Sequence, residues 1–124
     1  MTASRTVLVI DDDNLLRKSL AQALTEAGYA VHEAQDGQTG LQVALTKHPN
    51  IIVTDVKMPE LDGLQMVEKL RTDEWGKTAP VIILSTDETT ASVNEALVAN
   101  VTTYLPKSTA SPDDIISQIK QMLS

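Results

Sequence analysis

The sequence predicts a single α/β domain with a parallel, doubly wound sheet, and two observations support this fold class. Short apolar runs rich in Val and Ile alternate with segments whose leucines recur at helical spacing. Short connections join these segments, as expected for βα units whose helices cover both faces of a sheet. With 124 residues, 42% of them apolar, the chain can build one core. We therefore expect five strands and five helices in one domain over residues 1–124.

The first βα unit begins with the continuous apolar run Val7–Ile10, which predicts a strand. Three leucines then follow at four-residue intervals and are expected on one face of a helix: Leu16, Leu20 and Leu24. Gly28 is expected to end this helix, because glycine readily adopts the left-handed conformation found at helix C-termini.

The second unit has a weaker strand at residues 30–33 and a helix that ends before Pro49. The apolar positions of this helix are Leu41, Ala44 and Leu45.

The third and fourth strands are predicted at residues 51–54 and 81–84, where the apolar residues are consecutive. This pattern is typical of central strands that are covered on both faces. The helix between them carries Leu64, Val67 and Leu70 on one face.

The last part of the chain predicts a fourth helix, a fifth strand at residues 102–105 and a fifth helix. Ser111 is placed to cap the fifth helix, and Pro112 suits its first position. The residues expected on the apolar faces of these two helices are Val93, Ala96 and Leu97 for the fourth, and Ile115, Ile119 and Met122 for the fifth.

Acidic side chains follow the first and third predicted strands directly. Asp11, Asp12 and Asp13 come after the first strand, and Asp55 comes after the third. Parallel strands end at one edge of a sheet, so these carboxylates should meet there, where each close pair repels by about 1 to 4 kcal/mol. Asp13 fits a helix cap best, whereas the convergence of the others predicts a Mg²⁺ site, with Mn²⁺ also possible.

Two other strand ends supply a hydroxyl and an amine. Ser85 ends the fourth strand and Lys107 follows the fifth. Each residue alone is more often structural or solvated. Together with a carboxylate nucleophile and a metal ion, however, they form a set that can accept and stabilise a phosphoryl group.

The residues Ile10–Asp12, the segment Asp55–Gly63, Ser85 and Lys107 together resemble the receiver domain of bacterial response regulators. The D-x-x-M-P-x-x-D-G segment is the most specific part, and the resemblance covers essentially the whole chain. It implies a flavodoxin-like fold with strand order 2-1-3-4-5.

The same resemblance implies a role for each site residue. Asp55 would be the phosphoacceptor and Asp12 a direct Mg²⁺ ligand, while Asp11 would help to hold the ion through water. The backbone carbonyl of Lys57 would be a further ligand. Lys107 would contact the phosphoryl group.

A switch is implied as well. Ser85 would supply the hydroxyl that moves toward the phosphoryl group, and Tyr104 the aromatic ring that reorients with it, although Tyr104 could equally be an ordinary strand aromatic. The phosphoryl donor would be a sensor histidine kinase or a phosphotransfer protein. The output would be altered contact with an unknown downstream protein through the face of the fourth helix, fifth strand and fifth helix.

One departure from the family pattern concerns the residue after Lys107, which is Ser108 where the family usually has proline. A cis bond without proline costs about 3 to 4 kcal/mol. We therefore expect a trans bond, with Lys107 still pointing toward Asp55.

Charge and composition exclude several classes of function. Seventeen acidic residues against ten basic ones give a net charge of -7, which opposes direct binding of nucleic acid or an anionic membrane. Without cysteine there is no disulfide or thiolate metal site. The apolar runs are too short to span a membrane, so a cytoplasmic location is expected.

Three rival functions compete with a receiver that catalyses only its own phosphorylation and dephosphorylation. A small Mg²⁺-dependent phosphohydrolase with an aspartyl-phosphate intermediate is the main alternative, but Lys57 stands where a second acid would be expected. The intact acid cluster disfavours a receiver-like module that only binds partners. The low aromatic content, 2%, disfavours a flavin-binding protein.

Overall fold

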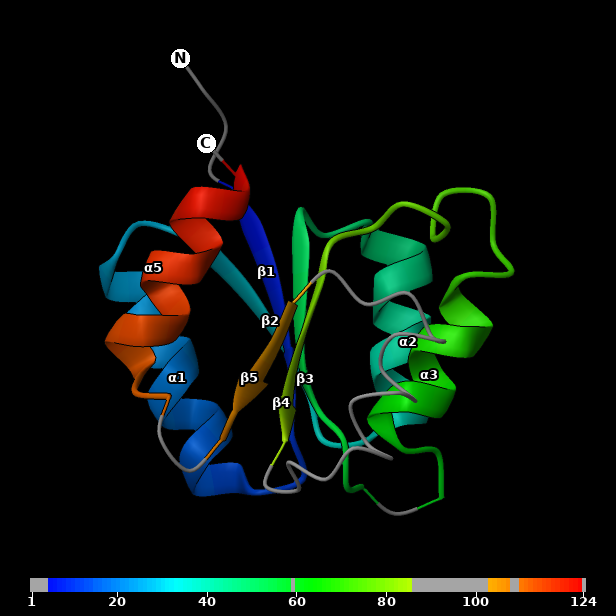
Figure 1. The fold of residues 1–124 in the computed structure, drawn as a ribbon, viewed down its shortest axis with the longest axis horizontal. Helices are drawn as coiled ribbons and strands as arrows, with labels where there is room; N and C mark the ends of the chain where they lie inside the picture. Colours follow the sequence, from blue (N-terminus) through cyan, green and yellow to red (C-terminus); the bar gives the residue numbers. More distant parts are fainter. Residues whose placement is uncertain (1–4, 59, 86–102, 108–109, 124) are drawn as a thin grey trace.

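The computed structural model describes residues 5–58, 60–85, 103–107 and 110–123. Its strands form one parallel sheet in the order β2-β1-β3-β4-β5, which confirms the predicted topology (Figure 1). The strands are β1 (Thr6–Ile10), β2 (Ala30–Ala34), β3 (Ile51–Asp55), β4 (Val81–Ser85) and β5 (Thr103–Pro106). The described helices are α1 (Asn14–Glu26), α2 (Gly37–Lys47), α3 (Gly63–Leu70) and α5 (Pro112–Leu123).

The sheet is covered on both faces, with α1 and α5 on one side and α2 and α3 on the other (Figure 1). Alternate residues of each central strand enter two separate cores: Val7 and Val9 face the α1 and α5 side, whereas Leu8 and Ile10 face the α2 and α3 side. Residues with opposite orientations are therefore both buried. This explains why the central strands read as continuous apolar runs.

The helix boundaries follow their predicted signals. Asp13 caps α1 by accepting hydrogen bonds from the backbone of Leu15 and Leu16. At the other end, Gly28 adopts a φ of 101° and its N–H donates to the carbonyl of Thr25.

The start of α5 also follows its signal. The Ser111 hydroxyl accepts from the backbone N–H of Asp114, whose carboxylate accepts from the backbone N–H of Ser111. This reciprocal pair satisfies two backbone donors at the helix start.

Two of the leucines predicted to lie in the core do not. Leu16 is 48% exposed and Leu45 is 37% exposed. The buried face of α1 is instead formed by Arg17, Leu20, Ala21 and Leu24. Residues four apart drift by about 40° around a helix, so a series of four-residue steps does not stay on one face.

The other differences are small or lie outside the described residues. The first four strands each extend one residue beyond the predicted range, at one end or the other, and β5 extends to Pro106. The predicted fourth helix, with Val93, Ala96 and Leu97, falls outside the residues that the structure describes, as does Thr102. Within the described ranges, no helix combines the length and the apolar character needed to cross a bilayer.

Candidate functional site

Three carboxylates meet at the carboxyl edge of the sheet, as the sequence predicted. β1 and β3 are adjacent and parallel, so the residues at and just beyond their ends lie side by side. One carboxylate oxygen each from Asp11, Asp12 and Asp55 lies within 4.8 Å of the others. Asp11 and Asp55 are buried, 5% and 6% exposed, whereas Asp12 is exposed. The cluster is therefore open to solvent on the Asp12 side.

Lys107 enters this cluster from just beyond the end of β5. Its ammonium nitrogen lies 3.0 Å from Oδ2 of Asp11 and 3.0 Å from Oδ2 of Asp55. One cation thus bridges two buried carboxylates at the ends of different strands, and Lys107 points inward as predicted. The geometry of the Lys107–Ser108 bond falls outside the described residues.

The pKa values of Asp55 and Lys107 are both raised. Burial raises the pKa of Asp55, the hydrogen bond and charge of Lys107 oppose this, and the nearby charge of Asp11 adds to it. Burial alone would lower the pKa of Lys107, but its hydrogen bonds and charge interactions with Asp11 and Asp55 outweigh that effect. The ammonium therefore remains a firmly held cation beside the acid pair.

Backbone groups fix the orientation of the two buried acids. Oδ1 of Asp11 accepts from the N–H of Asp13 at 2.9 Å, and Oδ1 of Asp55 accepts from the N–H of Val56 at 2.8 Å. Gly63, the first residue of α3, packs directly on the carbonyl of Asp55, where a Cβ would clash with backbone atoms. A glycine is thus required for α3 to begin this close to the site.

The donor set fits a hard divalent cation. Mg²⁺ prefers oxygen ligands and is commonly held by one or two carboxylates together with water. The cluster supplies carboxylate oxygens from Asp11, Asp12 and Asp55, and its exposed side leaves room for water. The cluster therefore offers the oxygen ligands and the access to water that Mg²⁺ binding requires.

The other predicted site residues lie on or just after strands β3, β4 and β5. Ser85 pairs in register with Pro106 at the ends of β4 and β5, and the residue before it, Leu84, pairs with Asp55. Lys57 is exposed in the loop after β3. Tyr104 is half-buried on β5 and packs against the core on the α2 and α3 side.

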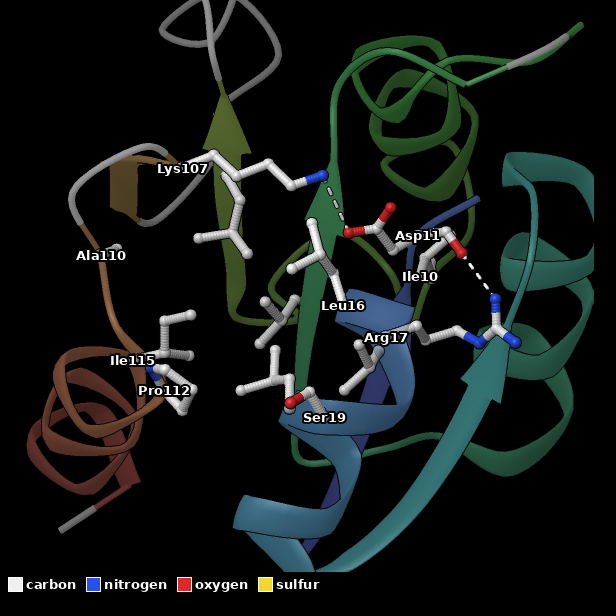
Figure 2. Close-up of a pocket in the computed structure, with 13 residues that line it drawn as sticks. Ile10, Asp11, Leu16, Arg17, Ser19, Lys107, Ala110, Pro112 and Ile115 are labelled. Atoms are coloured by element: carbon white, nitrogen blue, oxygen red, sulfur yellow. Dashed lines mark hydrogen bonds and ion pairs between the residues drawn. The ribbon is translucent and has the colours of Figure 1, made fainter. Parts of the chain in front are cut away.

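An apolar cavity of about 220 Å³ lies beside the acid cluster, between α1 and α5 (Figure 2). Asp11 and Lys107 contribute to its lining, together with apolar residues that include Leu16, Leu20 and Ile115. Apolar walls next to Lys107 lower the local polarity, which strengthens its interaction with the carboxylates.

The sequence prediction missed Arg17 and Glu33. Arg17 is buried on α1, and its guanidinium donates to the carbonyl oxygen of Asp11 and to the carboxylate of Glu33 on β2. A cation in a leucine-containing helix usually marks a solvated face. The available signal was the spacing of Arg17 from Leu20, Ala21 and Leu24, which places it on their face.

The chain is similar in sequence to curated response regulators over most of its length. The chain is 34% identical over 117 residues to the response regulator MprA of Mycolicibacterium vanbaalenii, covering 94% of this chain and 49% of that protein. It is 33% identical to MprA of Mycobacterium leprae, covering 94% and 50%. The chain thus spans about half the length of the curated relatives it matches.

Solved structures show the same fold over nearly their whole length. The chemotaxis protein CheY4 of Vibrio cholerae superimposes with a TM-score of 0.90 at 28% identity, covering 96% of this chain and 98% of that one. A CheY-like receiver domain protein from Methanospirillum hungatei gives a TM-score of 0.90 at 25% identity, with 98% and 94% coverage. Residues 7–120 match the family described as the response regulator receiver domain. The chain therefore belongs to the receiver domain family of two-component response regulators.

Proposed function

We propose that Asp55 is the residue that accepts the phosphoryl group in this receiver. The observation that carries the proposal is the meeting of Asp55 with two other carboxylates and with the ammonium of Lys107. Asp55 is the acid at the end of a central strand, and its carboxylate lies close to that of the exposed Asp12 and contacts the amine of Lys107. Its carboxylate can therefore act as a nucleophile beside groups that neutralise added charge.

The proposed reaction is a transfer from a phosphohistidine. A carboxylate oxygen of Asp55 attacks phosphorus and forms an O–P bond as the P–N bond to the imidazole breaks. The bonding electron pair stays on the imidazole nitrogen, which then takes up a proton. Water attack on the aspartyl phosphate reverses the modification and yields inorganic phosphate.

The proposed metal ligands are Asp12 directly, Asp11 through water, Asp55, and the backbone carbonyl of Lys57. When bound, Mg²⁺ supplies positive charge that offsets the negative charge of the transferring group, and Mn²⁺ offers the same chemistry. Asp12 is the exposed member of the cluster and can bind the ion without being displaced from a buried position. Lys57 contributes its backbone, which is compatible with an exposed side chain.

The phosphorylated state is proposed to be stabilised by Lys107. Its formation is proposed to change the conformations of Ser85 and Tyr104. Phosphorylation replaces one charge on Asp55 with close to two and adds acceptor oxygens. Lys107 already bonds Oδ2 of Asp55 and can follow the new oxygens. The Ser85 hydroxyl would donate to one of them, and Tyr104 would take up the space it leaves, which gives two states that phosphorylation biases.

The partners are also proposals. A sensor histidine kinase or a phosphotransfer protein would donate the phosphoryl group in the cytoplasm, and a downstream protein would bind the face formed by the fourth helix, β5 and α5. The receiver would catalyse only its own phosphorylation and dephosphorylation. We further propose that residues 1–124 act as one receiver domain.

The test is uptake of one phosphoryl group from a small phosphodonor in Mg²⁺, followed by mass spectrometry. Wild type should gain one acid-stable, base-labile adduct, whereas Asp55→Asn should gain none. Asp13→Asn is the matched control, because it makes the same chemical change at an exposed neighbouring cap that asparagine can still form. Equal adducts on wild type and Asp55→Asn contradict the proposal, and turnover of small phosphoesters would favour the phosphohydrolase.

A further inference from the structure

Arg17 is a buried cation on α1, next to the acid cluster. Its side chain is 4% exposed, although it carries a permanent charge. Nη1 donates to the backbone carbonyl oxygen of Asp11 at 2.9 Å, and Nε donates to Oε1 of Glu33 at 3.0 Å. Figure 2 shows Arg17 and Lys107 reaching Asp11 from opposite sides. Arg17 binds the backbone of Asp11, whereas Lys107 binds its carboxylate.

The backbone of Arg17 makes a second contact with the same turn. Its N–H donates to the carbonyl oxygen of Asp13 at 2.9 Å as the first helical bond of α1. One residue therefore binds the carbonyl groups on both sides of Asp12. The N–H of Asp11 is held as well, by the carbonyl of Ala34 on β2 at 3.0 Å. These bonds leave the turn that presents Asp12 with little freedom to change its direction.

Packing alone does not explain a guanidinium at this position. The neighbouring positions on the buried face of α1 are Leu20, Ala21 and Leu24, and a further apolar side chain would cover β2 without the cost of burying a charge. The planar guanidinium offers two donors in fixed directions, which match the Asp11 carbonyl and the Glu33 carboxylate. The guanidinium is therefore oriented to bind the backbone of the turn that carries Asp11 and Asp12.

We propose that Arg17 is a positioning residue for the metal site, and that Glu33 holds its guanidinium in place. Arg17 would fix the backbone of Asp11 so that Asp11 and Asp12 both face Asp55. Outer groups that orient metal ligands typically change metal affinity by about 10- to 100-fold when removed. This inference rests on the proposed function, in which Asp11, Asp12 and Asp55 hold Mg²⁺.

The sign of the effect separates positioning from simple electrostatics. A positive charge near an acid cluster repels Mg²⁺, so its removal alone would tighten Mg²⁺ binding. Loss of a positioning contact would weaken binding instead. Arg17→Met removes both the charge and the contact. Arg17→Lys keeps the charge but replaces the fork with one ammonium, which cannot reproduce both directed bonds.

The experiment measures the Mg²⁺ dissociation constant by calorimetric titration without a phosphodonor, at a temperature where circular dichroism shows each variant folded. We expect Arg17→Met to raise the dissociation constant about tenfold. Arg17→Lys should raise it by a smaller factor. Lys18→Met is the matched control, since it removes the same charge from the exposed neighbouring residue on α1, and its binding should be unchanged or slightly tighter.

The outcomes distinguish this inference from the proposed function. If Arg17→Met binds Mg²⁺ as tightly as wild type or more tightly, Arg17 does not position the site. If Arg17→Met does not fold, the Mg²⁺ affinity of Arg17→Lys is the test. Wild-type affinity in Arg17→Lys would overturn the inference. Asp12→Asn tests the site itself: if wild type does not bind Mg²⁺, or binds it equally well without Asp12, the proposed metal site fails and this inference with it.

Discussion

The ammonium of Lys107, just beyond the end of β5, is 3.0 Å from a carboxylate oxygen of Asp11, just beyond the end of β1. Two strands, β3 and β4, lie between β1 and β5 in the sheet, so the lysine side chain reaches across their ends. The same nitrogen is 3.0 Å from Asp55, which is 52 residues away in sequence. Both acids are buried, so this one amine balances charge that folding concentrates at the sheet edge.

Replacing Lys107 should therefore destabilise the metal-free protein. Lys107→Met removes two charge-assisted bonds and leaves Asp11 and Asp55 facing each other without this cation. We expect a loss of about 2 kcal/mol in the free energy of unfolding, measured by urea titration in EDTA. Mg²⁺ should restore more stability to this variant than to wild type, because the ion can neutralise the same acids.

Lys77→Met is the control for the lysine substitution. Lys77 is exposed in the loop after α3, so its replacement should change stability by less than about 0.5 kcal/mol. If the two variants unfold at the same urea concentration in EDTA, the ammonium of Lys107 does not stabilise the acid pair.

The raised pKa of Asp55 predicts a pH-dependent gain in stability on replacing it. Since burial raises this pKa above 3.8, the folded protein holds the proton more tightly than the unfolded chain, and wild-type stability falls as pH rises from 3.8 through the raised pKa. Asp55→Asn cannot ionise, so its stability relative to wild type should increase between about pH 3 and pH 7 in EDTA.

The measurement for Asp55 is a series of urea titrations across that pH range, with Asp13→Asn as the matched exposed control. The relative stability of the control should stay nearly constant. A variant Asp55→Asn that is less stable than wild type at neutral pH would show that the Lys107 contact outweighs the burial of the charge.

Most of the fold could be predicted because its strongest signals are local. Strands buried on both faces require consecutive apolar residues, as in Ile51–Asp55 and Val81–Ser85. The helix ends at Asp13, Gly28 and Ser111 depend on hydrogen bonds within a few residues, so sequence spacing identified them.

The phase of α1 could not be fixed by its leucines alone. Leu16 and Leu24 are eight residues apart and differ by about 80° around the helix, so only one of them could lie at the centre of the buried face. Packing on the sheet buries Leu24, and Arg17 is buried in consequence. The partner that makes its burial tolerable, Glu33, lies on β2, and helical periodicity carries no information about it.

The site acids were predictable from strand ends, but the contacts of Arg17 were not. Asp11 directly follows β1 and Asp55 is the last residue of β3, so the parallel sheet places them together. The bond from Arg17 joins a helix side chain to a backbone carbonyl, which every residue possesses and no sequence pattern marks. Such contacts become visible only when the turn after β1 is seen in three dimensions.

Gly63 is predicted to be essential for the position of Asp55. In Gly63→Ala the added Cβ would clash with the Asp55 carbonyl and lie 3.1 Å from the Cα of Val56. Relief of this clash must move the start of α3 or the end of β3. We expect a loss of about 2 kcal/mol in the free energy of unfolding and slower phosphoryl uptake, measured by urea titration and by mass spectrometry over time.

Gly28→Ala separates stability from site geometry. Gly28 has no neighbour within 4 Å of an added Cβ, but its φ of 101° makes alanine strained there. A loss of about 1 kcal/mol is expected from the backbone alone, with unchanged phosphoryl uptake in the folded protein. Equal uptake rates in the two alanine variants would show that the close packing of α3 on Asp55 has no effect on the site.

The ring of His48, at the end of α2, stacks on Trp75 in the loop after α3, and we predict that this stack stabilises the fold. The two ring centroids are 4.3 Å apart with 11° between the planes. His48 has a φ of 48°, which asparagine tolerates, so His48→Asn removes the ring without adding backbone strain. We expect a loss of about 1 kcal/mol in the free energy of unfolding.

Trp75 is the only tryptophan in the chain, so its fluorescence reports this contact directly. Without the covering ring, water gains access to one face of the indole, and the emission maximum of His48→Asn should shift to longer wavelength. His32→Asn is the control, because His32 is a half-buried residue on β2, and its replacement should leave the emission unchanged. An unchanged maximum in His48→Asn would mean that other side chains shield the indole, and that the stack contributes little to the burial of Trp75.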